Sequence, residues 1–260
     1  MRRWLAVLLA CALPAWASEE APVPFITTPD EVVERMLALA GTRAHDLVVD
    51  LGSGDGRIVI AAARKYGARA LGIELDPGLV AKARENARLA GVAERVSFLR
   101  GDVLEADYSA ASVVTVYLLP GLINRLQPLF LEHLQPGTRI VSHAFTMTGW
   151  KPDRRELVRI AKPHPGQGDE SALYLWIVPA DVRGLWRAPD TQLKIHQNFQ
   201  EIELEGRLLG RDIRTSHARL RGDELEWQVD GMRFQGRLRG KAISGELVDG
   251  ERRQALVLSR

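Results

Sequence analysis

Glycines and an acidic side chain follow the first apolar segment that is predicted to form a strand. Residues 48–57 read Val-Val-Asp-Leu-Gly-Ser-Gly-Asp-Gly-Arg, a strand that continues into a glycine-rich turn and then a helix. Glycine adopts positive φ angles, and it lets a ligand approach main-chain N–H groups because no Cβ is in the way. This turn therefore predicts a ligand-binding site made largely by the backbone.

Two carboxylates stand at the ends of the next two predicted strands. Glu74 closes the strand at 69–74, and Asp102 comes just after the strand at 96–99. Because ligands of open α/β sheets bind at the carboxyl ends of parallel strands, we expect both acids to face the same crevice as the glycine turn. There, Glu74 could accept hydrogen bonds from two ribose hydroxyls and Asp102 from an adenine amino group. Hydrogen bonds to charged groups contribute roughly 1.5 to 3 kcal/mol each.

The spacing of the glycines disfavours a dinucleotide site. The G-x-G-x-x-G fingerprint requires a third glycine where this chain has Arg57, so a pyrophosphate cradle is not expected. A nucleoside that has no phosphate and is attached to a cationic sulfur fits an acidic crevice better than NAD does.

These motifs together resemble those of the class I S-adenosylmethionine-dependent methyltransferases, over about residues 24–180. Residues 50–56 look like their first motif, residues 72–76 like the second strand with its ribose-binding acid, and residues 101–103 like the adenine-side motif. The resemblance implies S-adenosylmethionine as the cofactor, with the glycine turn at its methionine end. The cofactor-binding residues expected from the motifs are Asp50, Gly52, Ser53, Gly54, Asp55, Gly56, Glu74, Asp102, Phe25 and Thr28.

A narrower resemblance rests on the N-terminal segment. Residues 24–29, together with residues 55–59, are similar to the lysine methyltransferases that act on the ATP synthase c-subunit and the adenine nucleotide translocase, and to their bacterial relatives. It implies methyl transfer to an amine, with protein lysine as the expected acceptor and a protein as the partner. Phe25 and Thr28 are then expected to cover the cofactor, although Thr28 could instead be a helix N-cap. The export signal and the β-rich tail depart from the family's usual pattern.

Aromatic residues after the fourth and fifth predicted strands are candidates for the acceptor side. Residues 117–120 read Tyr-Leu-Leu-Pro, without the Asn/Asp-Pro-Pro-Tyr/Phe motif of many base methyltransferases. Tyr117 and His143 are the candidate catalytic residues, and Phe145, Met147 and Trp150 are candidates for the acceptor pocket. Ordinary packing is the alternative for His143 and Trp150. The remaining histidines lack ligand spacing, so no metal site is expected.

The chain contains 46% hydrophobic and 26% charged residues, a composition that excludes a disordered or fibrous protein. Lys and Arg number 35 against 33 acids, and the net charge of +2 gives no general attraction for nucleic acid. Nucleic acid is therefore not an expected partner.

Short β-branched runs alternate with helical stretches between residues 28 and 178, which is typical of a parallel sheet covered on both faces. We therefore expect an α/β fold with a seven-stranded doubly wound, Rossmann-like methyltransferase sheet at 24–180. Its predicted strands lie at 47–51, 69–74, 96–99, 112–118, 139–143, 157–160 and 173–178. Its predicted helices lie at about 28–40, 56–67, 77–91 and 122–134.

The rest of the chain has a different pattern. Between residues 190 and 260, seven short alternating runs are separated by glycine-containing turns such as Asp230-Gly231 and Asp249-Gly250. This pattern predicts an antiparallel β module, either a meander or a small barrel. Residues 179–189 are the expected linker.

The N-terminus has the pattern of an export signal. Residues 1–17 combine two arginines, a short apolar run and an Ala-Trp-Ala cleavage pattern, which predicts a signal peptide and no transmembrane span in the mature chain. The expected location is the periplasm or cell envelope, or the cytoplasm if the signal is not used. Acylation at Cys11 is an alternative processing route. Cleavage after Ala17 leaves a chain without cysteine, and hence without a disulfide.

Export leaves a second function class open. S-adenosylmethionine is made in the cytosol, so an exported non-catalytic protein that binds an envelope partner on a methyltransferase scaffold is an alternative. Methylation of a small molecule is a third hypothesis. The presence of Asp50, Glu74 and Asp102 favours catalysis, while the sequence does not indicate the oligomeric state.

Overall fold

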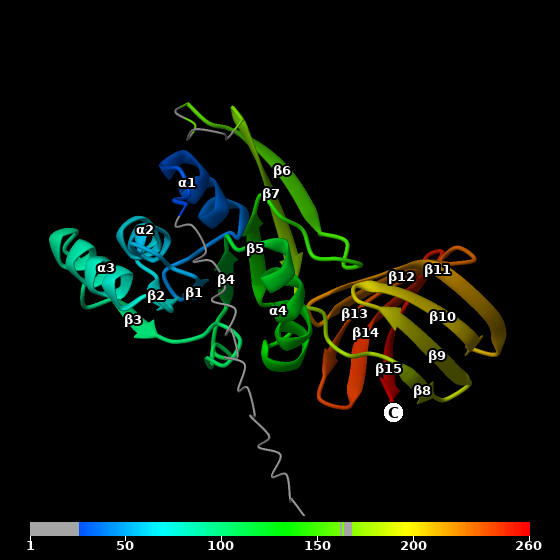
Figure 1. Cartoon of the computed structure of the whole chain (residues 1–260). Helices are drawn as coiled ribbons and strands as arrows, with labels where there is room; N and C mark the ends of the chain where they lie inside the picture. The colour runs from blue at the N-terminus through cyan, green and yellow to red at the C-terminus, as the bar shows by residue number, and fades with distance from the viewer. Residues whose placement is uncertain (1–25, 162, 164–167) are drawn as a thin grey trace, which may run out of the picture.

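Strands and helices alternate along the first two thirds of the chain, and strands alone follow. The structure, a computed structural model, describes residues 26–161, 163 and 168–260. The predicted signal peptide, Cys11 and Phe25 lie outside these residues. Figure 1 shows a sheet flanked by helices and, beside it, a barrel that ends at the C-terminus.

Within the described residues, seven strands form one sheet in the order β3-β2-β1-β4-β5-β7-β6. The strands β1 to β5 are parallel, whereas β7 runs antiparallel to both β5 and β6. This confirms the predicted seven-stranded doubly wound sheet. The strand bounds are β1 Leu47–Leu51, β2 Arg69–Glu74, β3 Val96–Arg100, β4 Val113–Val116, β5 Arg139–His143, β6 Arg154–Arg159 and β7 Glu170–Ile177.

Helices cover both faces of the sheet. Its central strands can be buried on both sides because their side chains are mostly apolar, and the buried polar ones, such as Asp50 and Thr115, bond to each other. Val48 of β1 packs in the cluster formed with α1, α2 and α3, while its neighbour Val49 packs in the cluster formed with α4. Alternate residues of one strand thus enter two different cores, as expected for a strand buried on both sides. The helix bounds are α1 Asp30–Leu39, α2 Arg57–Tyr66, α3 Pro77–Leu89 and α4 Pro120–His133. None of these helices is long and apolar enough to cross a membrane.

The strand order reverses at β1, which pairs with β2 on one side and with β4 on the other. The connection after β1 returns through α2 to β2, and the chain later crosses to β4. A crevice forms at such a switch point, outside the carboxyl ends of the strands, because the two flanking connections leave in opposite directions. Asp50 lies there, and the register places it beside Gly72 of β2 and Thr115 of β4.

The C-terminal strands close into a barrel in the order β10-β11-β12-β13-β14-β15-β8-β9. Closure removes exposed strand edges, and alternate side chains fill the interior, with Trp186, Trp227 and Phe234 among the largest. The strand bounds are β8 Gly184–Ala188, β9 Thr191–Asn198, β10 Glu201–Leu208, β11 Arg211–Arg221, β12 Glu224–Val229, β13 Met232–Arg239, β14 Ala242–Asp249 and β15 Arg252–Ser259.

The predicted linker at 179–189 is partly wrong, because it contains β8. This strand is five residues long and lies between Gly184 and Pro189, so its alternating pattern is too short to recognise. It is needed for closure, since it pairs with β9 and contacts β15 through Arg187 and Ser259. Its Trp186 is fully buried in the barrel.

Candidate active site

A cavity of about 520 Å³ lies at the carboxyl ends of β1, β2, β3 and β4. The glycine turn, two strand-end carboxylates and the segment before α1 all contribute to it, as the spacing of the motifs predicts. Its lining includes Thr28, Asp50, Gly52, Ser53, Gly54, Asp55, Glu74, Asp102, Tyr117 and Leu118. Gly56 and His143 are not among its lining residues, and Phe25 lies outside the described residues.

Packing explains two of the glycines in the turn. A Cβ on Gly52, whose φ is 77°, would lie 2.7 Å from Cδ2 of Leu118. A Cβ on Gly56, whose φ is 82°, would lie 2.7 Å from Cζ of Phe98. Gly56 precedes α2 and packs against Phe98 outside the cavity lining, and its role in cofactor binding stays a prediction. It is a packing position that lets α2 approach β3.

Glu74 is oriented by two backbone N–H groups. Gly54 donates to its Oε2 at 2.8 Å, and Asp76 donates to its Oε1 at 3.0 Å. Each oxygen can accept further bonds, because a carboxylate has about four acceptor sites. The two oxygens are therefore fixed and still available to a pair of vicinal hydroxyls, and the bond to Gly54 ties the end of β2 to the glycine turn.

Asp50 is the buried acid of the site. Only 2% of its surface is exposed, and Oγ1 of Thr115 donates to its Oδ1 at 2.7 Å. Burial, together with the nearby charges of Glu74 and Asp55, raises the pKa of Asp50 to about 7, although the bond from Thr115 acts in the opposite direction. A cation bound beside Asp50 would stabilise the ionised carboxylate.

Asp102 contributes from the end of β3. Its Oδ1 accepts a hydrogen bond from Leu104 N at 2.9 Å, which fixes the side chain at the mouth of the cavity. Ser53 adds a buried hydroxyl, which has no hydrogen-bond partner among the described residues. A buried polar group without a partner in a cavity wall is typical of a site that a ligand or water completes.

These features fit S-adenosylmethionine. Glu74 and Asp102 can hold the ribose and the adenine amino group, and the acidic Asp50 suits the positively charged methionine end. The tight glycine turn lets the ligand approach the backbone, and Ser53 has an unused hydroxyl. Among the described residues, no group of three or more His, Cys, Asp or Glu side chains is arranged to hold a metal ion.

Arg57 lines the cavity, although the sequence motif singles it out only because it stands where a dinucleotide fingerprint has a glycine. Its Nε and Nη2 donate to the two oxygens of Asp55 at 3.0 and 2.7 Å, and its Nη1 donates to Thr28 O at 2.8 Å. Burial acts to raise the pKa of Asp55, but the hydrogen bonds and charge of Arg57 outweigh it and lower that pKa. Arg57 therefore fastens the segment before α1 to the glycine turn. In the sequence, the only indication of this role is that the opposite charges of Asp55 and Arg57 lie two residues apart.

Thr28 is not the N-cap of α1. Pro29 occupies the N-cap position, and no side chain caps the helix. Thr28 is instead buried, lines the cavity and lies 3.3 Å from Nδ1 of His143 through its Oγ1. The segment before α1 thus contributes to the cavity lining, and the covering role that the resemblance implies for Thr28 stays a prediction.

His143 lies behind the cavity wall rather than in it. It is fully buried, its Nε2 is hydrogen-bonded to Ser171 Oγ, and burial lowers its pKa to about 4. Its ring lies against that of Tyr117, with centroids 4.0 Å apart. Tyr117 does line the cavity, and it also stacks with Phe145 at 6.3 Å. His143 is thus neutral near pH 7 and supports Tyr117.

The prediction that Met147 and Trp150 line an acceptor pocket is wrong. Their exposed fractions are 2% and 1%, and both pack in the core on the α4 side of the sheet. An aromatic run after a strand reads the same whether it lines a pocket or fills a core, so the sequence could not separate the two. Of the candidate aromatic residues, Tyr117 lines the cavity, and Phe145 stacks on Tyr117.

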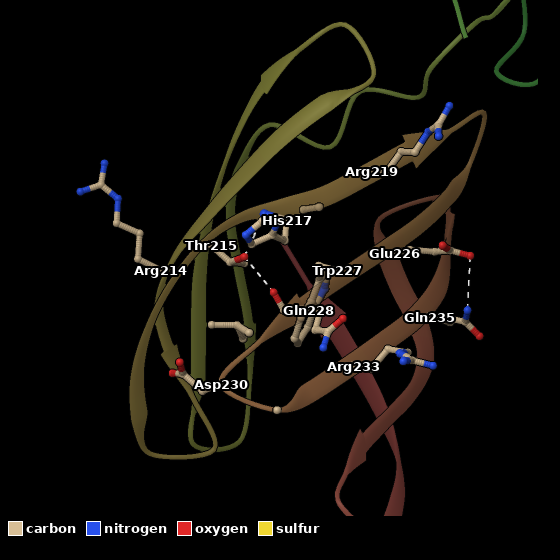
Figure 2. Close-up of a pocket in the computed structure, with 13 residues that line it drawn as sticks. Arg214, Thr215, His217, Arg219, Glu226, Trp227, Gln228, Asp230, Arg233 and Gln235 are labelled. Atoms are coloured by element: carbon tan, nitrogen blue, oxygen red, sulfur yellow. Dashed lines mark hydrogen bonds between the residues drawn. The ribbon is translucent and has the colours of Figure 1, made fainter. Parts of the chain in front are cut away.

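A larger hollow, of about 880 Å³, lies on the barrel where β11 separates from β12. These strands pair only between Ala218–Arg221 and Glu224–Trp227, and beyond them the Thr215 hydroxyl donates to Gln228 O at 2.8 Å. Figure 2 shows this bond, with Arg214 and Arg219 extending away from it. This groove is lined by antiparallel strands and the Asp230-Gly231 turn, and it has no carboxylates at the ends of parallel strands. The candidate active site is therefore the cavity of the sheet.

Comparison with known proteins identifies the family of this chain. The model of the ANTKMT methyltransferase domain family matches residues 50–154. A protein-lysine N-methyltransferase of Saccharolobus islandicus is 41% identical over 139 residues, which are 53% of this chain and 85% of that protein. The chain belongs to this methyltransferase family. It is an S-adenosylmethionine-dependent methyltransferase, and its cofactor is S-adenosylmethionine.

Two further relatives show the breadth of the family. The lysine N-methyltransferase of Xenopus laevis that is named for the ATP synthase c-subunit is 34% identical over 57% of this chain and 66% of its own length. The adenine nucleotide translocase lysine N-methyltransferase of Mus musculus is 38% identical over 50% of this chain and 56% of its own length. The methyltransferase thus spans just over half to two thirds of these animal relatives.

A solved structure carries the same fold. An RNA methyltransferase from Salinibacter ruber, in complex with S-adenosyl-L-homocysteine, is 50% identical to this chain with a TM-score of 0.54. The match covers 60% of this chain and 96% of that one. The bound S-adenosyl-L-homocysteine of that protein is the demethylated form of the cofactor assigned here.

Proposed function

We propose that this methyltransferase transfers a methyl group to a lysine side chain of a protein. The observation that carries the proposal is the 41% identity to a protein-lysine N-methyltransferase over 85% of that protein's length. The aromatic wall of Tyr117 and Phe145 beside the cavity supports it, because such faces attract ammonium and methylammonium groups.

S-adenosylmethionine supplies a methyl group on a cationic sulfur. With the cofactor bound, an acceptor nitrogen would take this methyl group, the carbon–sulfur bond would break, and the positive charge would pass from sulfur to nitrogen. In our proposal, Glu74, Asp102 and Asp50 hold the cofactor, and Thr28, fastened by Arg57, covers it. Tyr117 borders the path of the acceptor. Its pKa is raised by burial, so it stays a neutral phenol near neutral pH.

A dedicated general base is not required. A lysine amine with a pKa of about 10.4 must lose its proton, which at pH 7 costs about 4.6 kcal/mol. Alignment of two bound reactants contributes about 7 to 11 kcal/mol. Because alignment outweighs the cost of deprotonation, the buried and neutral His143 need not take the proton.

The test is transfer of a labelled methyl group from S-adenosylmethionine to proteins of a cell extract. We expect protease-sensitive label that yields methyllysine on hydrolysis, and no transfer by Gly54→Arg, which places a large side chain in the turn. Label recovered only in small molecules would contradict the proposal and favour the small-molecule alternative. The non-catalytic envelope-binding alternative finds no support among the comparisons, which match this chain to enzymes.

RNA is a second candidate acceptor, because the protein described as an RNA methyltransferase is 50% identical to this chain. The Tyr-Leu-Leu-Pro sequence at residues 117–120 does not favour it, since a base-gripping motif is not there. Ribonuclease treatment of the labelled extract separates the two acceptors, because it releases the label only if RNA is methylated.

We also propose that residues 1–17 direct export of the chain to the periplasm or cell envelope. Support comes from the charged start, the short apolar run and the small-residue cleavage pattern. A fusion of residues 1–25 to a reporter tests it: an exported reporter supports the proposal, and a cytosolic one overturns it. Mass spectrometry of the mature N-terminus would distinguish cleavage after Ala17 from acylation at Cys11.

A further inference from the structure

The barrel contacts the sheet region through the turn between β9 and β10. Phe199, at this turn, stacks on Trp150 with ring centroids 5.2 Å apart and an interplanar angle of 6°. The neighbouring Gln200 is 6% exposed, and its side chain makes two hydrogen bonds. Its Oε1 accepts from Nε1 of Trp150 at 2.9 Å, and its Nε2 donates to Lys151 O at 2.6 Å. Both the oxygen and the nitrogen of the side-chain amide therefore have hydrogen-bond partners in the loop that follows β5.

Trp150 is the far end of a loop that begins at the active site. This loop, residues 144–150, leaves the end of β5 and carries Phe145, which stacks with Tyr117 of the cavity wall. Along the loop, Thr148 N donates to Asn124 Oδ1 of α4 at 2.8 Å. Trp150 O accepts from Nε1 of Trp176 at 2.9 Å. One short loop thus joins the acceptor wall to the barrel.

The start of the loop is strained. Ala144 has a φ of 66°, and Phe145 N donates to His143 O at 2.8 Å across it. A turn of this kind is unfavourable for a residue other than glycine, and it persists where the surrounding contacts determine it. The Ser142 hydroxyl donates to Phe145 O at 2.6 Å and holds one side of the turn. The contacts of Trp150 hold the other end of the loop.

We propose that Phe199 and Gln200 are positioning residues for methyl transfer. They fix loop 144–150 by holding Trp150, and the loop fixes Phe145 against Tyr117, the wall along which the acceptor approaches. The barrel therefore acts on the reaction through this turn. The inference rests on the proposed function for the identity of the acceptor, while the structural link is independent of it.

Hydrogen exchange in the full-length protein tests the link without an acceptor. In Gln200→Ala, amide exchange in residues 144–150 is expected to accelerate about tenfold, with residues 50–56 unchanged. Phe199→Ala should act likewise, and Phe199→Tyr should restore protection because it keeps a ring on Trp150. Thr215→Val is the matched control, since it removes the hydrogen bonds of a buried hydroxyl-bearing side chain elsewhere in the barrel. Unchanged exchange in 144–150, or acceleration equal to that of the control, overturns the proposal.

Kinetics test the consequence for transfer, with poly-L-lysine as the acceptor probe and calorimetric titration of S-adenosylmethionine. We expect kcat/KM for poly-L-lysine to fall about tenfold in Gln200→Ala and Phe199→Ala, while cofactor affinity stays within twofold. An equal fall in Thr215→Val, or a parallel loss of cofactor affinity, overturns the proposal. If the wild-type protein methylates neither poly-L-lysine nor cell proteins, the lysine acceptor is wrong, and the exchange experiment still decides the positioning role.

Discussion

At the scale of single residues, the site depends on how each carboxylate is held. Glu74 is fixed by two backbone N–H groups, Asp50 is buried beside Thr115, and Asp55 is paired with Arg57. The three acids share one cavity but differ in environment, so they can perform different tasks. Glu74 presents fixed acceptors, Asp50 favours a cation, and Asp55 holds the polypeptide that covers the cavity.

Asp50 makes the stability of the cofactor-free protein pH-dependent. Its pKa is raised to about 7 in the folded state, from an unfolded value of about 3.9. The folded protein therefore favours the protonated form of Asp50. The contribution of this group to the free energy of unfolding is fully present below pH 4 and is lost as the pH rises through 7. We expect Asp50→Asn to lack this loss, so that its stability relative to wild type increases between pH 5 and 8. Urea denaturation at both pH values measures it, and parallel changes in the two proteins would contradict it.

Glu74→Gln is expected to weaken cofactor binding. The substitution removes the charge from an acceptor that two ribose hydroxyls are proposed to use, and such hydrogen bonds contribute about 1.5 to 3 kcal/mol. The dissociation constant for S-adenosylmethionine should rise at least about tenfold in calorimetric titration. Glu85→Gln, on the exposed face of α3 and bonded to Arg88, is the control and should bind normally. Equal affinity in the two variants would remove Glu74 from the site.

At the scale of elements, the guanidinium of Arg57 holds the segment before α1 at the cavity. This guanidinium binds both oxygens of Asp55 and the carbonyl of Thr28, three bonds that share one plane of donors. The glycine turn and the start of α2 are consequently tied to Thr28. A planar fork is needed for this, and a lysine at the same position cannot reproduce it.

Arg57→Lys therefore keeps the charge beside Asp55 but releases the cover. We expect faster dissociation of S-adenosylmethionine, by about fivefold or more, with a nearly unchanged association rate, measured by stopped-flow fluorescence. Arg64→Lys, on the same helix α2 but near its C-terminal end, should leave both rates unchanged. A change confined to the association rate would contradict the role assigned to Arg57.

At the scale of the whole molecule, the contacts between the barrel and the sheet include two turns of the barrel. One carries Gln200, which contacts Trp150, and the other is the β11–β12 turn, which brings Gly222 against Gly137, before β5. Gly222 O also accepts from Ala180 N at 2.8 Å. Arg219 adds an ion pair to Asp153 at 3.1 Å. Contacts spread over two turns fix the orientation of the barrel better than the connecting segment alone.

Gly222→Ala is expected to destabilise this junction. A Cβ there would lie 2.9 Å from Cα of Gly137, and φ is 62°. Gly240→Ala shares the positive φ, at 59°, but meets nothing within 4 Å, so it controls for the backbone effect. We expect Gly222→Ala to lose about 1 to 3 kcal/mol more than Gly240→Ala, measured by urea denaturation. Equal losses of stability in the two variants would show that the turn at Gly222 is not tightly packed against Gly137.

The sequence by itself predicted the order of the sheet elements and a set of candidate cofactor residues. Periodicity identified the sheet strands, and the positions of Asp50, Glu74 and Asp102 relative to those strands placed them at one edge. These inferences succeed because a parallel sheet brings the ends of its strands together whatever the side chains elsewhere. Gly56 shows the limit, since a glycine needed for packing has the same appearance as one needed for a ligand.

Only the tertiary structure decided the partners of these residues across the chain. The register that sets Thr115 beside Asp50, the approach of Ser171 to His143 and the docking of Gln200 on Trp150 join segments that are distant in sequence. Such contacts depend on strand register and on domain packing, which local periodicity does not encode. The strand β8 is likewise defined by its pairing with β9 and β15 and by the burial of Trp186, which its short sequence does not reveal.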